Sequence, residues 1–130
     1  TSVRNPAGSG TQTAGLSSGG NNGPGVTGTT QEYDGTNWTT SPGTMNVARE
    51  NATAFGIQTA TIVAGGNEPG TNVAEQYDGS TWTSGTSYPA PVSNIGVAGT
   101  NTAGLAWGGD QDCTFSTTTN IPAADEEANE

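Results

Sequence analysis

The chain has 130 residues, room for one ordinary domain, and a formal net charge of -10, because 12 acidic residues stand against only Arg4 and Arg49. This balance argues against nucleic acid and anionic membrane surfaces as partners, because both are bound by clustered Lys and Arg. No stretch approaches the roughly 18 apolar residues of a membrane helix, so membrane insertion is not expected.

Three related segments follow one another along the chain. They read "GTQTAGLSSGG" at 10–20, "GIQTATIVAGG" at 56–66 and "GTNTAGLAWGG" at 99–109, at steps of 46 and 43 residues. A third recurrent piece, seen best as "MNVARENATAFG" at 45–56, resembles the start of the chain, where Arg4 lies near the place of Arg49. A period in the forties is typical of propeller blades and solenoid units.

Each unit is predicted to be β throughout, because short runs rich in Thr, Val and Ile are bounded by Gly, Asn and Pro. One strand precedes the "GxQTA" piece, a second ends at the double glycine, a third ends at Tyr-Asp-Gly, and a fourth begins near Trp. We expect repeats at about 10–55 and 56–98 and a partial repeat from 99, together a repeat region at 1–110. An atypical segment with an acidic tail occupies 111–130.

The first two units also share a heptad, "YDGTNWT" at 33–39 and "YDGSTWT" at 77–83. Asp-Gly between two β runs predicts a hairpin, so the aspartates are interpreted as turn residues. The loop is formed either by Asp34 and Gly35 or by Gly35 and Thr36; both registers place Tyr33 and Trp38 on one face.

The second copy repeats this arrangement, so each hairpin is expected to carry an aromatic pair that pins it. The double glycines are expected where another backbone or a bulky ring comes close. The structural repeat residues are therefore Gly19, Gly20, Tyr33, Asp34, Gly35, Trp38, Gly65, Gly66, Tyr77, Asp78, Gly79, Trp82, Gly108 and Gly109.

The Gly-Gly…Tyr…Trp skeleton over residues 1–110 resembles the kelch repeat. The segments "YDGTNWT", "MNVAR" and "GTQTAGL" are similar to kelch-like repeats in virion proteins of marine bacteriophages. The resemblance implies four-stranded antiparallel blades and a structural or binding role on a virion or other extracellular particle. A closed propeller typically needs four to eight blades. We therefore expect an incomplete propeller or an open β array: a piece of a longer propeller, one part of a ring of copies, or a stack covered by neighbouring subunits.

Catalytic chemistry finds little support in the sequence. The chain has no His, which removes the commonest general base and most zinc and copper sites, so neither an enzyme nor a cofactor is expected. Asp110 and Asp112 could ligate Ca²⁺, but the spacing of a twelve-residue calcium loop is missing and a plain polar loop is the alternative.

Two functions follow. The first is a non-enzymatic structural subunit, such as a phage appendage, knob, fibre or decoration protein, whose partners are copies of itself or neighbouring virion proteins. The second is a carbohydrate-binding adhesin module that contacts a host surface glycan through the loops at 21–30 and 67–75 or through Trp107. In the plainer interpretation these are spacer loops and Trp107 belongs to the core.

Overall fold

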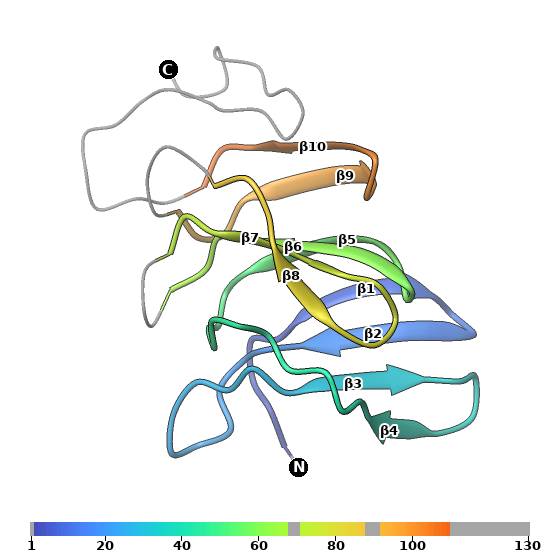
Figure 1. Cartoon of the computed structure of the whole chain (residues 1–130). Coiled ribbons are helices and arrows are strands. Elements are labelled where there is room, and N and C mark those ends of the chain that lie inside the picture. Colours follow the sequence, from blue (N-terminus) through green and yellow to red (C-terminus); the bar gives the residue numbers. More distant parts are fainter. Residues whose placement is uncertain (1, 68–70, 88–91, 110–130) are drawn as a thin grey trace.

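The computed structural model describes residues 2–67, 71–87 and 92–109, and within these ranges the chain forms ten strands and no helix (Figure 1). None of the described segments is a helix that could cross a membrane. The strands are β1 (Ala7–Thr11), β2 (Ala14–Ser18), β3 (Thr30–Tyr33), β4 (Trp38–Thr40), β5 (Thr53–Ile57), β6 (Ala60–Ala64), β7 (Ala74–Tyr77), β8 (Trp82–Ser84), β9 (Gly96–Thr100) and β10 (Ala103–Trp107).

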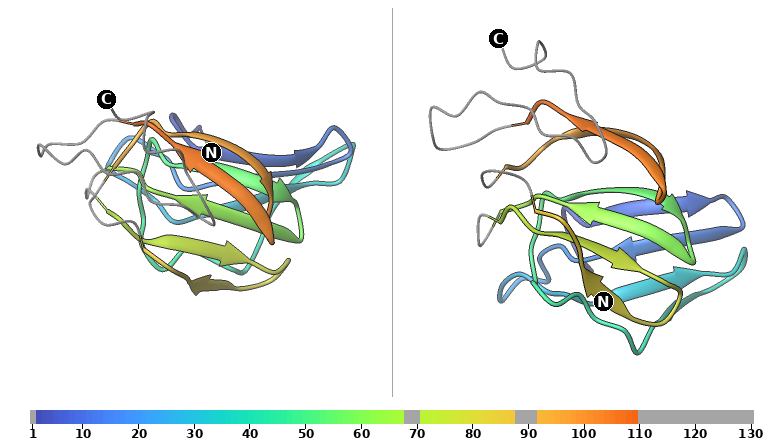
Figure 2. Two further views of the ribbon diagram at one scale, coloured as in Figure 1. Left: turned by 90° about the horizontal axis from the view of Figure 1, so that it is seen from above. Right: turned by 45° about the horizontal axis from the view of Figure 1, so that its top comes forward.

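The strands form three antiparallel sheets in chain order: β1-β2-β3-β4, β5-β6-β7-β8 and the hairpin β9-β10. The views in Figures 1 and 2 show them as successive layers, with the second sheet between the other two. The prediction of an all-β chain with two four-stranded antiparallel sheets and a smaller third one is confirmed, and the array is open. The outer strands β4 and β8 have only three residues each.

Each sheet has a front face, directed toward the preceding sheet, and a back face, directed toward the following one. The back face of the first sheet contributes Ala7 and Leu16 to a buried cluster with Val63, Tyr77 and Trp82 from the front face of the second. A second cluster joins the back face of the second sheet to the final hairpin and its approach; it contains Phe55, Ile62, Ala64, Ala74, Val92, Ile95 and Ala106. The core is therefore two interlayer seams.

An asparagine in the left-handed backbone region precedes each sheet. Asn5, Asn51 and Asn94 have φ values of 53°, 55° and 54°, a region that Asn tolerates better than most residues. The Asn51 amide donates to the Asn5 carbonyl at 3.2 Å, and the Asn94 amide donates to the Asn51 carbonyl at 3.3 Å. This ladder joins the three lead-in segments, which we define as residues 3–5, 49–51 and 92–94.

The ladder also corrects the alignment of the two arginines by one residue. Arg4 bridges Asn21, and Glu50 bridges Asn67, so Arg4 occupies the place of Glu50. The counterpart of Arg49 in the first repeat is therefore Val3, and in the third repeat it is Val92. Only the middle repeat carries an arginine at this position.

The two heptad tryptophans provide a matched test of the interlayer packing. Trp82 is 7% exposed and Trp38 is 54% exposed, although both stand opposite a tyrosine. We predict that Trp82→Ala lowers the free energy of unfolding by about 3–5 kcal/mol through cavity formation. Trp38→Ala should cost only about 1 kcal/mol, the size of the aromatic pair itself. Denaturant unfolding followed by circular dichroism checks this; equal losses for the two variants would contradict it.

Candidate functional site

The heptads form hairpins with directly opposed rings. Tyr33 pairs with Trp38 and Tyr77 with Trp82, the register in which Gly35 and Thr36 form the first loop. The ring centroids are 5.2 Å and 5.0 Å apart, with the planes tilted by 34° and 33°. Both pairs lie on the front face of their sheets: the second pair faces the first sheet, and the first pair lies on the end face of the array.

Asp34 and Asp78 close these hairpins. The Asp34 carboxylate accepts from the amides of Thr36 and Asn37 at 2.8 Å and 2.7 Å, and Gly35 follows at φ 95°. The Asp78 carboxylate accepts from the amides of Thr81 and Ser80 and from both of their hydroxyls. The amides of Asn37 and Thr36 lower the pKa of Asp34, and the donors on Thr81 and Ser80 lower the pKa of Asp78 to about 2. Both carboxylates are engaged in their turns.

The double glycines bring the lead-in segment of the next repeat against the sheet. The Gly20 amide donates to the Arg49 carbonyl and the Gly66 amide to the Val92 carbonyl, each at 2.8 Å. A Cβ on Gly19 would lie 2.7 Å from the Arg49 carbonyl oxygen, and one on Gly65 would lie 2.3 Å from that of Val92. Gly108, at φ 70° like its counterparts, has nothing within 4 Å of such a Cβ among the described residues.

A polar network fills the seam between the first and second sheets. The Trp82 indole N–H donates to Thr30 Oγ1 at 2.8 Å, and the Tyr77 hydroxyl donates to the Glu32 carboxylate while it accepts from Ser41. Burial first, and then the bond to Glu32, raise the pKa of Tyr77 to about 12. The second aromatic pair is thus fixed by side chains of the first sheet.

A buried ion pair lies in the same seam. The guanidinium of Arg49 donates to Glu75 at 2.5 Å and to the carbonyls of Gly65 and Val73, and all side-chain atoms of the pair are shielded from solvent. Glu75 also accepts from the backbone amides of Asn46 and Val47. Burial lowers the pKa of Arg49, and Glu75 counteracts this shift.

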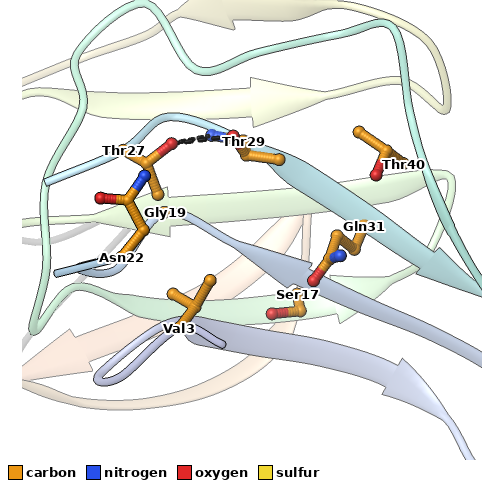
Figure 3. Close-up of a pocket in the computed structure, with 8 residues that line it drawn as sticks. All are labelled: Val3, Ser17, Gly19, Asn22, Thr27, Thr29, Gln31 and Thr40. Carbon is orange, nitrogen blue, oxygen red and sulfur yellow. Dashed lines mark hydrogen bonds between the residues drawn. The ribbon is translucent and has the colours of Figure 1, made fainter. Parts of the chain in front are cut away.

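The first sheet has a pocket at the place that Arg49 fills in the second. The row Gly8, Ser17, Gln31, Thr40 crosses the first sheet as Ala54, Val63, Glu75, Ser84 crosses the second. Val3 and Gln31 therefore replace Arg49 and Glu75. The resulting pocket has a volume of about 130 Å³, and its lining is drawn in Figure 3: Val3, Ser17, Gly19, Asn22, Thr27, Thr29, Gln31 and Thr40.

Both ends of the array are neutral faces. The strand residues on the front face of the first sheet are Gly8, Gly10, Gly15, Ser17, Gln31, Tyr33, Trp38 and Thr40, and none is charged. The back face of the final hairpin consists of Gly96, Ala98, Thr100, Ala103, Leu105 and Trp107, again without charge. Leu105 and Trp107 are 39% and 37% exposed, and β10 alternates strictly between exposed and buried residues.

The remaining sequence-based candidates are placed as follows. Trp107 lies across Gly96, where an added Cβ would meet the indole ring at 2.6 Å, and is not a core residue. Within the loop at 21–30, Asn22, Thr27 and Thr29 line the pocket. Asp110, Asp112 and the tail at 111–130 lie outside the described residues. Within the described part of the chain no group of three or more His, Cys, Asp or Glu side chains could hold a metal.

Sequence reasoning did not identify the Arg49–Glu75 pair or the partners of Tyr77. The sequence does contain a signal for this pair. The first repeat has Val3 and Gln31 at the positions where the second repeat has Arg49 and Glu75, so both members of the pair change together. Reading it required the one-residue shift in alignment that the asparagine ladder supplies. No protein-family model matches the chain, and no curated protein matches it in sequence.

The ion pair can be tested by exchanging it for the residues of the first sheet. Arg49→Val should lower the free energy of unfolding by about 3–5 kcal/mol, because it leaves the Glu75 carboxylate buried without its cation. The double variant R49V/E75Q should recover at least about 1 kcal/mol of this loss, since it removes the unpaired charge. Denaturant unfolding of the single and double variants gives the coupling. A double variant no more stable than R49V would contradict the assignment.

The Asp78 turn predicts a specific response to acid. Because the folded pKa of about 2 lies below the ordinary value near 4, the carboxylate contributes stability that is complete above about pH 4. That contribution is lost as the pH falls toward 2. The stability difference between the native chain and Asp78→Asn should therefore shrink over this interval. Carboxyl-carbon NMR titration checks the midpoint, and a value near 4 would refute the prediction.

Proposed function

We propose that the chain is a non-enzymatic structural subunit of a virion or extracellular assembly, and that it assembles by continuing its own stack of sheets. The observation that carries the proposal is the pair of uncharged end faces. Within the chain, the front faces of the second sheet and of the final hairpin are each covered by the preceding sheet. The front face of the first sheet and the back face of the final hairpin correspond in position to these buried front and back faces, but they have no such cover among the described residues.

The kelch-like sequence pattern supports this role. Two four-stranded antiparallel sheets that follow the Gly-Gly…Tyr…Trp skeleton have the make-up of propeller blades, and the array that the described residues form is open. The similarity of the repeats to those of phage virion proteins favours an appendage, knob, fibre or decoration protein. The conspicuous polar side chains Asp34, Asp78, Glu32 and Glu75 each have a structural partner, which favours a scaffold over a catalyst.

A carbohydrate-binding adhesin is the second candidate, and the pocket of Figure 3 is the feature that favours it. Hydroxyl and amide groups of Ser17, Thr29 and Gln31 line the pocket, and the half-exposed Trp38 belongs to the same sheet face. Polar groups beside an aromatic ring suit a sugar. A glycan array with the native chain and with Trp38→Ala tests this, and a blank array retires the candidate.

The structural proposal predicts self-association in solution. Light scattering coupled to size exclusion should give masses that are multiples of 12.9 kDa at micromolar concentration, with discrete particles in electron microscopy. Because the end faces are neutral while each copy carries a net charge of -10, added salt should strengthen association by screening repulsion. A 12.9 kDa monomer at every concentration and salt level would overturn the proposal.

A further inference from the structure

The three repeats differ at the position where one sheet meets the lead-in segment of the next. Ser18, Ala64 and Trp107 occupy the same position, each on a back face and immediately before a double glycine. The segments that dock on the first two double glycines begin with Arg49 and Val92. The first junction thus combines an arginine with a serine, and the second combines a valine with an alanine, which belong to one buried cluster.

Both side chains of the first junction are buried. Ser18 is 2% exposed and Arg49 is 1% exposed. Ser18 Oγ and Arg49 Nε are also buried without a hydrogen-bond partner among the described residues. The arginine occupies buried space over the front face of the second sheet, and the residue at position 18 of the first sheet is small.

At the two ends of the array the sizes are reversed: the back face has a large side chain and the front face has an open pocket. Trp107 places an indole on the back face of the final hairpin, half-exposed and lying over Gly96. On the front face of the first sheet, Val3 and Gln31 leave open the volume that Arg49 and Glu75 occupy in the second. Gly8 beside this pocket has only one backbone atom near its would-be Cβ, at 3.8 Å. A bulky ring and an open pocket therefore face outward at opposite ends of one chain.

We propose that copies of this chain join head to tail, with Trp107 of one copy filling the pocket formed by Val3, Ser17 and Gln31 of the next. The backbone continues the same pattern. The Gly20 amide donates to the Arg49 carbonyl and the Gly66 amide to the Val92 carbonyl, so the Gly109 amide would donate to the Val3 carbonyl of the second copy. The inference rests on the proposed self-assembly and specifies the contact through which it occurs.

Such an interface is heterologous, because it joins two different surfaces. Repetition of a heterologous contact gives a closed ring or an open filament. The absence of charge from the strands of both faces fits this pairing, since neither face brings an unpaired ion into the junction. Inside the chain, each equivalent face is covered by another sheet of the same kind. A second copy of the chain would supply such a sheet to each end face.

Two variants each remove one half of the contact. Trp107→Ala removes the ring, and the double variant V3R/Q31E fills the pocket with the pair found in the second sheet without changing the net charge. Each should weaken association at least tenfold in sedimentation equilibrium. Ile57→Ala is the matched control, because Ile57 is 54% exposed and lies outside both end faces; it should leave association unchanged.

Mixing the two variants separates a heterologous contact from a symmetric one. The V3R/Q31E copy keeps Trp107, and the W107A copy keeps an open pocket, so an equimolar mixture should associate in a 1:1 ratio although neither variant associates alone. The triple variant V3R/Q31E/W107S should associate again, because it recreates the serine, arginine and glutamate of the first internal junction. Circular dichroism checks folding. If V3R/Q31E is unfolded, Ser17→Arg blocks the same pocket instead.

The outcomes distinguish the inference from the proposed function. A native chain that assembles while W107A assembles equally well overturns the head-to-tail contact and leaves the structural role standing. A mixture that stays monomeric, although the native chain assembles, also overturns it. A native chain that is monomeric throughout overturns the structural role itself.

Discussion

The backbone hydrogen bonds from Gly20 to Arg49 and from Gly66 to Val92 determine how closely one layer follows another. Each bond requires the preceding glycine to lie against a carbonyl at a distance that a Cβ would not permit, and both glycines of each pair adopt positive φ. The asparagine ladder also links each lead-in segment to the next by a backbone hydrogen bond. Side-chain packing in the seams, including the buried Tyr77 and Trp82, depends on this backbone contact.

The polar groups between the first two sheets illustrate what a buried seam demands. Arg49 lies within hydrogen-bond reach of two carbonyls and a carboxylate, and Glu75 accepts two backbone amides in addition. These hydrogen bonds offset part of the cost of removing both charges from water. The outward-facing counterparts, Val3 and Gln31, carry no charge and need no such partners. The front face of the first sheet therefore has no ion pair at the position where the interior seam has one.

Much of the fold could be predicted from the sequence, because its information is local. Asp-Gly between β runs marked the hairpins β3-β4 and β7-β8, and the double glycines marked the ends of β2, β6 and β10. The register with Gly35 and Thr36 in the loop remained open, because both alternatives place Tyr33 and Trp38 on one face. The interlayer partners could not be predicted. Tyr77 meets Glu32 across 45 positions of sequence, and no periodicity within a single strand specifies which layer will lie opposite.

The short outer strands β4 and β8 have a consequence for how material can be added to this molecule. A foreign strand that paired with either edge would gain a ladder of only three residues, too little to hold it against the entropy of ordering it. Widening of the sheets at the β4 and β8 edges is therefore discouraged, whereas the broad end faces remain available. A larger object built through the end faces would keep the width of a single four-stranded sheet, whether it closes into a ring or extends as a filament.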